Sequence, residues 1–185
     1  QPAPAIESGL SGWTWLAFLA ALVTSVGSMM LSFEGLIPCP LCYYQRTLAF
    51  GVFGVLTLGV VGRVKAPVSL LAMPLALSAL GVAIFHVYLE MNNTLECPLG
   101  LFNMGSAPVQ SLVALSLLTI ILFIDLRTQC SHGQAVPGSF LVALLVGGLI
   151  TFACIKSAPA IKAPAKPYPA DKELKGCRPR YLGSE

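Results

Sequence analysis

Residues 13–33 read WTWLAFLAALVTSVGSMMLSF, an apolar run without a charged side chain. A helix of about 20 predominantly apolar residues crosses the hydrocarbon core of a bilayer, so this run is long enough to span. Four more apolar runs follow, at residues 43–61, 68–89, 109–124 and 140–155. We therefore predict an all-α membrane protein: a four-helix transmembrane bundle with a fifth transmembrane helix.

Composition supports membrane lipid as the surroundings of this chain. Of 185 residues, 56% are hydrophobic and only 10% are charged, whereas soluble domains carry about 25% charged residues. No basic stripe interleaved with aromatic residues is present, so we expect no nucleic-acid partner. Two histidines without His-x-x-x-His spacing, and only one Cys-x-x-Cys set, argue against a dedicated metal site.

The chain divides into one bundle and two ends. We assign residues 12–156 to the transmembrane bundle and residues 1–11 to a mobile lead-in. Residues 157–185 are rich in Pro, Ala and Lys, a composition that favours an extended tail over a packed domain.

The motif Cys39-Pro-Leu-Cys42 opens the second apolar run, and Arg46 follows one helical turn later. Two thiols at this spacing can close a small, reducible disulfide. Cys42 and Arg46 share a helix face, and a nearby cation favours the thiolate, which is the reactive form of cysteine. At a lipid–water boundary, such a site can pass electrons between a soluble thiol protein and a carrier dissolved in lipid. The alternative interpretation is a structural disulfide or two idle thiols.

The five spans also decide which cysteines can meet. One membrane face receives four of them: Cys39, Cys42, Cys97 and Cys177. Cys154 lies near that face inside the fifth span, and Cys130 lies opposite. Cys97–Cys177 is therefore the first choice for a second pair, and Cys97–Cys154 is the second choice.

The orientation signals conflict. Arg63, Lys65 and Arg127 lie in the short turns, which marks their side as cytoplasmic by the positive-inside bias. The tail carries most of the remaining lysines and arginines, which by the same bias would place the tail in the cytoplasm. We follow the short turns, because disulfide chemistry needs an oxidising compartment, and we expect the redox cysteines to face the periplasm.

A first span followed by PCPLCYYQR at residues 38–46 resembles the DsbB family of disulfide bond formation proteins. The resemblance covers residues 13–126, and FHVYLE at residues 85–90 is similar to the family pattern as well. It implies a protein of the bacterial inner membrane that re-oxidises a periplasmic thioredoxin-fold thiol oxidase of the DsbA type. The electrons would pass to a membrane quinone, either ubiquinone or menaquinone.

The resemblance also assigns roles to individual residues. Cys39 and Cys42 become the pair nearest the quinone, with Cys42 as the thiolate beside the ring and Cys39 exchanging with the second pair. Arg46 would hold the carbonyl edge of the quinone, and His86 is a candidate quinone contact or proton source. Alternatively, Arg46 snorkels to the interface and His86 is a satisfied histidine within the bundle.

This chain departs from the family in its second cysteine pair. The family carries both of these cysteines in the loop before the fourth span, where this chain has only Cys97. Our hypothesis is that Cys177 replaces the missing partner, which makes Cys39, Cys42, Cys97 and Cys177 the catalytic set. Two other functions stay open. One is a non-catalytic subunit that joins other membrane subunits, and the other is a transporter component, which the scarcity of intramembrane charge disfavours.

Overall fold

The computed structural model describes residues 11–33, 35–62, 68–131, 138–162, 164–168 and 174–181. Five helices make up most of this part of the chain: α1 (Gly12–Phe33), α2 (Pro40–Gly62), α3 (Val68–Met91), α4 (Ala107–Ser131) and α5 (Ser139–Ser157). Each of them contains a stretch long and apolar enough to cross a membrane. The prediction of an all-α membrane protein is confirmed.

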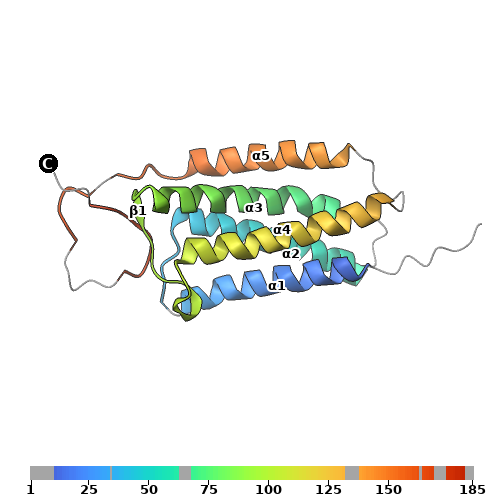
Figure 1. The fold of residues 1–185 in the computed structure, drawn as a ribbon, viewed down its shortest axis with the longest axis horizontal. Coiled ribbons are helices and arrows are strands. Elements are labelled where there is room, and N and C mark those ends of the chain that lie inside the picture. The colour runs from blue at the N-terminus through green and yellow to red at the C-terminus, as the bar shows by residue number, and fades with distance from the viewer. Residues whose placement is uncertain are drawn as a thin grey trace, which may run out of the picture.

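The helices lie side by side along one long axis, with α3 in the interior and α5 on the outside (Figure 1). Small side chains line the face of α3 that packs in the core, at Ala72, Ala76, Ala79 and Ala83, which are all buried. Small residues at this spacing let neighbouring helix backbones approach closely. The result is a tight bundle around α3, which has the largest buried share of the five spans.

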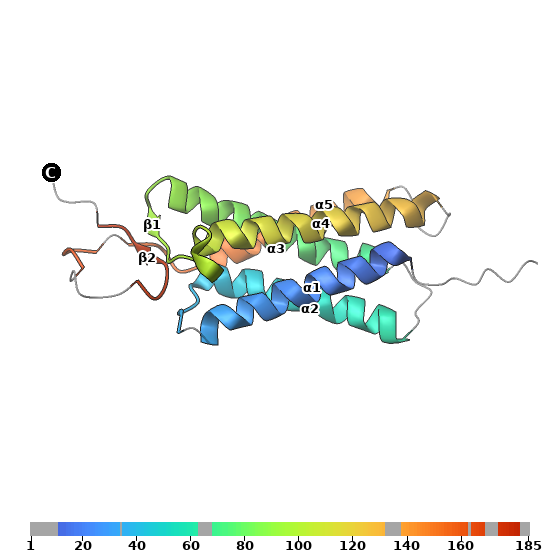
Figure 2. The ribbon, with the colours of Figure 1, turned by 60° about the horizontal axis from the view of Figure 1, so that its bottom comes forward.

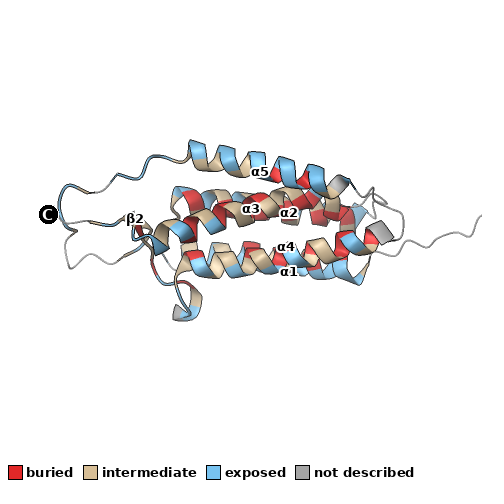
Figure 3. Ribbon diagram, turned by 45° about the horizontal axis from the view of Figure 1, so that its top comes forward, coloured by how far each residue is buried: buried red, intermediate tan, exposed pale blue. Residues whose placement is uncertain are grey.

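The fifth helix packs on α3 along one narrow stripe (Figure 3). A Cβ added at Gly147 would lie 2.9 Å from the Cβ of Leu77, whereas a Cβ at Gly148 would meet nothing within 4 Å. Gly147 therefore permits this close approach, and Gly148 does not take part in it. Ser78 on α3 donates a hydrogen bond to the carbonyl of Gly147 at 3.0 Å, which fixes this contact.

Helix α4 continues to Ser131, past the predicted end of its span at residue 124. The reason is that Asp125 is completely buried rather than exposed at a helix end. Its carboxylate accepts hydrogen bonds from the hydroxyls of Ser11, Thr14 and Ser69 and from the amide of Gln129. Ser11, expected in the lead-in, thus contacts the bundle. Residues 1–10, Arg63 and Lys65 lie outside the described residues, so the predicted orientation stays a prediction.

At the other end of the bundle the tail folds back (Figure 2). Strand β2 (Arg178–Pro179) pairs in antiparallel fashion with β1 (Leu95–Glu96), which follows α3. The short helix η1 (Leu101–Asn103) then leads toward α4. Part of the tail therefore packs on the bundle instead of remaining extended, and it brings Cys177 to the end where α2 begins.

Candidate functional site

The Cys-x-x-Cys motif lies at the start of α2. Pro40 is the first residue of the helix, a position that favours proline because the missing N–H has no partner there anyway. Cys39 precedes it, and the Cys39 sulfur accepts a hydrogen bond from the Cys42 backbone N–H at 3.2 Å. The Sγ atoms of Cys39 and Cys42 are 2.8 Å apart as free thiols. The helix N-terminus thus adds its positive potential beside the Cys39 sulfur, which favours a thiolate.

The second pair is formed by Cys97 and Cys177, which are joined by a disulfide. Cys97 follows β1 and Cys177 precedes β2, so the pairing of the two strands brings the cysteines together. Arg178 and Arg180 both bind the Glu96 carboxylate, at 3.3 and 3.1 Å. The first-choice pairing of the sequence is confirmed.

The second-choice pairing, Cys97–Cys154, is wrong. Cys154 is a free thiol on α5, and Cys97 is already bonded to the tail. The side chain of Cys130 lies outside the described residues.

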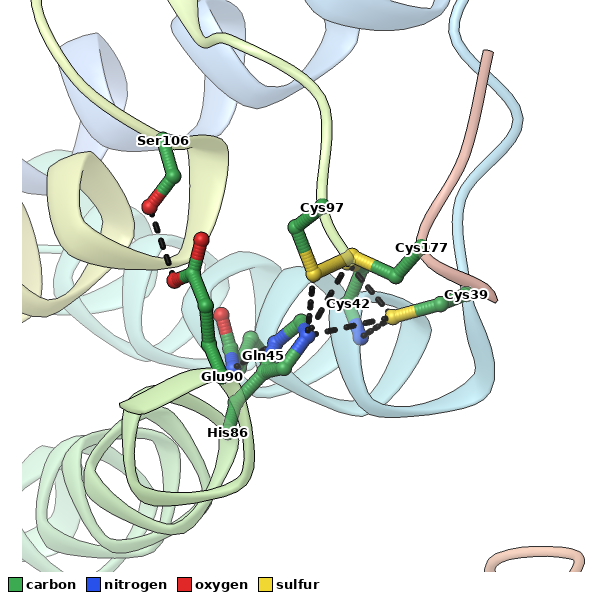
Figure 4. Close-up of a disulfide and its surroundings, with 8 residues drawn as sticks. All are labelled: Cys39, Cys42, Gln45, His86, Glu90, Cys97, Ser106 and Cys177. Atoms are coloured by element: carbon green, nitrogen blue, oxygen red, sulfur yellow. Dashed lines mark hydrogen bonds between the residues drawn. A yellow bond between two sulfur atoms is a disulfide. The ribbon is translucent and has the colours of Figure 1, made fainter. Parts of the chain in front are cut away.

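His86 on α3 connects the two pairs (Figure 4). The side chain is fully buried, and its Nε2 atom lies 3.7 Å from the Sγ of Cys39, 3.5 Å from that of Cys97 and 3.4 Å from that of Cys177. One imidazole nitrogen therefore contacts sulfur atoms from both cysteine pairs.

Two further polar side chains hold His86 from the opposite side. The amide of Gln45 lies 3.3 Å from Nδ1 of His86, and the hydroxyl of Ser111 donates to Oε1 of Gln45 at 2.5 Å. Sequence reasoning gave neither residue a role. A glutamine at the third position after Cys42, in a mainly apolar helix, was the available signal. Ser111 offered none, because only the packing of α4 on α1 and α3 places it beside Gln45.

A partly open cavity of about 270 Å³ adjoins Cys42 and Arg46. The Arg46 guanidinium donates to the hydroxyl and the carbonyl of Ser28 on α1, at 2.9 and 2.6 Å. The cavity wall is otherwise mainly apolar, and its lining from α1, α2 and α4 includes Val23, Gly27, Leu31, Ala49, Ala114 and Leu115. His86 is absent from the lining, so the structure brings Arg46, but not His86, to this cavity.

A second hollow lies between the Cys39 loop and the tail, with a volume of about 820 Å³. Its lining includes Ile37, Cys39, Tyr168 and Cys177. Cys177 also lines the first cavity, next to Cys42. The sulfur atoms therefore form a continuous path between an outer hollow beside the tail and an inner cavity between the helices.

The Cys39 thiol is strongly acidic in this arrangement. A hydrogen bond from the Cys42 thiol, together with a weaker one from His86, lowers the pKa of Cys39 to about 5, although burial opposes the shift. At neutral pH the thiolate of this pair is thus on Cys39. The resemblance had instead placed a thiolate on Cys42 beside Arg46.

Cys39, Cys42, Cys177 and His86 offer ligand atoms that lie within 4.8 Å of one another, so we considered a metal centre. Two thiolates on a tetrahedral zinc ion with Zn–S bonds of about 2.3 Å are roughly 3.8 Å apart. The Cys39 and Cys42 sulfurs are closer than that, at 2.8 Å, and Cys177 is already in a disulfide. The arrangement suits thiol–disulfide exchange better than metal coordination.

Comparison with known proteins gives a consistent result. Residues 11–132 match the family described as disulfide bond formation protein DsbB. A probable disulfide formation protein of Chlamydia trachomatis is 28% identical over 131 residues, which cover 63% of this chain and 96% of the relative. No solved structure matches. The family match covers α1 to α4 and contains both cysteines of the Cys-x-x-Cys motif. It ends before α5 and the tail with Cys177. The chain belongs to the DsbB family of disulfide bond formation proteins.

Proposed function

We propose that this protein is a quinone-dependent thiol–disulfide oxidoreductase of the bacterial plasma membrane, with its cysteines facing the periplasm. Its substrate is the reduced form of a periplasmic thioredoxin-fold thiol oxidase of the DsbA type. The observation that carries the proposal is the arrangement of the sulfurs at two cavities. Cys39 and Cys177 line the outer one, Cys42 and Cys177 line the inner one, and Cys97 is bonded to Cys177.

The outer steps involve the tail disulfide. A thiolate of the soluble partner attacks the Cys97–Cys177 bond, and the partner's second thiol releases itself as a disulfide, which leaves both cysteines of this chain as thiols. These thiols then reduce a Cys39–Cys42 disulfide by the same exchange. The electron pair thereby reaches the thiols nearest the membrane interior.

The inner cavity fits a quinone head group. Its volume of about 270 Å³ lies just below the usual range for small-molecule pockets of about 300–1,000 Å³, which is enough for a ring but not for a long isoprenoid tail. Apolar walls suit the ring, and Arg46, held by Ser28, supplies a fixed cation for a carbonyl oxygen. A bound quinone supplies the acceptor for two electrons and two protons. Cys42, at the cavity wall, is the thiol best placed to deliver them as the Cys39–Cys42 bond closes.

The test is stopped-flow mixing of the purified protein with a reduced DsbA-type partner, while quinone reduction is followed by absorbance. We expect Cys39→Ser, Cys42→Ser and Cys177→Ser each to abolish turnover, and Cys154→Ser to leave it unchanged. Failure of the unmodified protein to reduce ubiquinone and menaquinone analogues would refute the proposal. It would favour a non-catalytic member of the family whose disulfide only holds the tail.

A further inference from the structure

The imidazole of His86 is held between two different kinds of partner. Its Nε2 atom faces the sulfurs of Cys39, Cys97 and Cys177, and its Nδ1 atom faces the Gln45 amide. Gln45 and His86 are both buried, so water does not compete freely for these contacts. The proton on this ring therefore has a defined place that the neighbouring groups determine.

The hydrogen bonds can be followed one by one from Ser111. The Oε1 atom of Gln45 can only accept, so the Ser111 hydroxyl must be the donor in the 2.5 Å contact between them. The amide NH₂ of Gln45 then faces Nδ1 of His86. Because that NH₂ can only donate, Nδ1 is the accepting nitrogen, and a neutral ring carries its proton on Nε2.

We propose that Gln45, oriented by Ser111, is a positioning residue that fixes His86 as the Nε2–H tautomer, and that this single N–H stabilises the thiolate as it moves from one cysteine pair to the other. The inference rests on the proposed relay, because it concerns the exchange between the two disulfides. It places His86 at the sulfurs and gives Gln45 a role in the reaction.

The exchange can be written from the state that the structure holds, with a Cys39 thiolate and a Cys97–Cys177 disulfide. The Cys39 thiolate attacks the Sγ of Cys177. A Cys39–Cys177 bond forms, the Cys97–Cys177 bond breaks, and Cys97 leaves as a thiolate. The negative charge has moved from Cys39 to Cys97, and both of these sulfurs are within 3.7 Å of His86 Nε2.

In the second step Cys42 gives its proton to the Cys97 thiolate and attacks Cys39. The Cys39–Cys42 bond forms, the Cys39–Cys177 bond breaks, and Cys177 leaves as a thiolate 3.4 Å from His86 Nε2. No electron is lost or gained, one proton has moved, and one negative charge remains. The working direction of the relay is the reverse of these two steps. Cys42 is ionised only in passing, and the negative charge rests on the same three sulfurs, those of Cys39, Cys97 and Cys177.

The geometry accounts for which sulfurs His86 contacts. Cys39, Cys97 and Cys177 are the resting sites of the charge, and each of them is a contact of Nε2. Cys42, by contrast, lines the inner cavity and is held by the Cys39 sulfur. In the part of the chain that the structure describes, no hydrogen bond joins Cys42 to His86.

Other charged groups around His86 are engaged elsewhere. Glu90, one turn further along α3, accepts a hydrogen bond from the Ser106 hydroxyl at 2.8 Å. Arg46 on α2 is bound to Ser28 on α1. Among the described residues, the hydrogen-bond partner of the ring other than the three sulfurs is therefore the neutral amide of Gln45, which determines the tautomer.

The first test reads the tautomer directly. The chain has two histidines, so ¹⁵N-histidine NMR in detergent micelles, with His132→Gln for assignment, isolates the signals of His86. We expect the neutral Nε2–H tautomer in the unmodified protein. In Gln45→Glu we expect the Nδ1–H tautomer, because a carboxylate accepts a hydrogen bond where the amide donates one. An Nδ1–H ring with Gln45 in place, or no change in Gln45→Glu, would overturn the inference.

The second test measures the exchange without quinone, because Gln45 also lines the inner cavity. One equivalent of a small dithiol reduces the oxidised protein, and acid quenching with thiol alkylation and mass spectrometry then follows how fast thiols appear at Cys39 and Cys42. At pH 8 we expect Gln45→Glu to slow this step by about 10- to 100-fold, the value of one hydrogen bond to a charged group.

Gln45→Met serves as the matched control, because it keeps the length of the side chain and leaves the tautomer free. It should slow the exchange less than Gln45→Glu does. Equal exchange rates for all three proteins, or a loss in Gln45→Met as large as the loss in Gln45→Glu, would refute the positioning role. A failure of the relay itself looks different, because then the unmodified protein shows no exchange at all.

Discussion

The bundle buries a polar cluster at each end, and the two clusters differ in what their partners can do. At one end, Asp125 accepts hydrogen bonds from hydroxyl and amide groups on α1, α3 and α4. At the other end, His86 contacts three sulfurs that can exchange bonds with one another, and two cavities adjoin them. The Asp125 carboxylate has a fixed donor for each hydrogen bond, so its cluster holds the helices together. The sulfurs around His86 can exchange bonds and lie beside cavities, so their cluster permits a reaction.

The largest difference between the two ends should appear in activity. Cys42→Ser removes the thiol that lines the inner cavity and should reduce quinone turnover to the background rate, while the thermal unfolding midpoint stays unchanged. Asp125→Asn should leave the turnover per folded molecule intact. Quinone absorbance assays on both variants, normalised to folded protein, make the comparison. Substantial turnover in Cys42→Ser would contradict the assignment of the sulfur end as the reactive one.

The free energy of unfolding should depend more on the Asp125 cluster than on the sulfur cluster. Asp125→Ala leaves several buried donors without an acceptor, and each unsatisfied group costs about 1–3 kcal/mol. Some of the hydroxyls can turn to helix carbonyls, so we expect a total loss of about 2–4 kcal/mol. Unfolding in mixed micelles measures it. A stability equal to that of the unmodified protein would show that the Asp125 cluster does not hold the helices.

The acidity of Cys39 separates the two thiols of the motif. With a pKa of about 5, Cys39 stays ionised from pH 8 down to pH 6 and gains its proton only as the pH falls through 5. The rate of its alkylation by iodoacetamide should therefore be flat between pH 6 and 8, whereas an ordinary thiol with a pKa of about 8.5 gains reactivity across that range.

Two substitutions sharpen this prediction. Cys42→Ala removes the strongest donor to the Cys39 thiolate and should move the alkylation profile furthest toward higher pH. His86→Ala should move it less, in the order of the causes that lower the pKa. Peptide mapping by mass spectrometry assigns the alkylated cysteine. A profile for Cys39 that rises steadily to pH 8 in the unmodified protein would contradict this account.

The smallest effect concerns the contacts of the tail. Arg180 is 44% exposed where it binds Glu96, and surface ion pairs contribute only about 0.2–1 kcal/mol. Arg180→Ala should therefore make the Cys97–Cys177 bond easier to reduce by no more than a few-fold at low salt. Titration with a glutathione redox buffer measures the change. A tenfold or larger effect would mean that the ion pair, rather than the pairing of β1 with β2, positions Cys177.

The two ends of the bundle could not be predicted equally well from the sequence. Hydropathy located all five helices, and topology paired Cys97 with Cys177, because the number of spans decides which loops share a face. The same hydropathy placed the end of α4 too early, since it treats Asp125 as a terminator of a span. Burial of that carboxylate depends on Ser11, Thr14 and Ser69, which lie far from it in the sequence.

The contacts of His86 could be predicted only in part. A histidine within a span indicates function, but whether it faces a cavity or the sulfurs depends on the rotation of α3. Gln45 and Ser111 come together beside it only when the helices of the bundle pack. The resemblance therefore gave the residues of the site, while the assignment of charge to Cys39 and of His86 to the sulfurs needed the structure.

The most direct test of the central claim, that the two cysteine pairs form one relay, is the double variant Cys42→Ser, Cys97→Ser under mild oxidation with diamide. Only Cys39 and Cys177 then remain of the four sulfurs. We predict that a Cys39–Cys177 disulfide forms at a rate independent of protein concentration, as shown by mass spectrometry of the digested protein without reductant. If the two cysteines stay reduced under conditions that close Cys97–Cys177 in the unmodified protein, the pairs do not exchange and the relay is refuted.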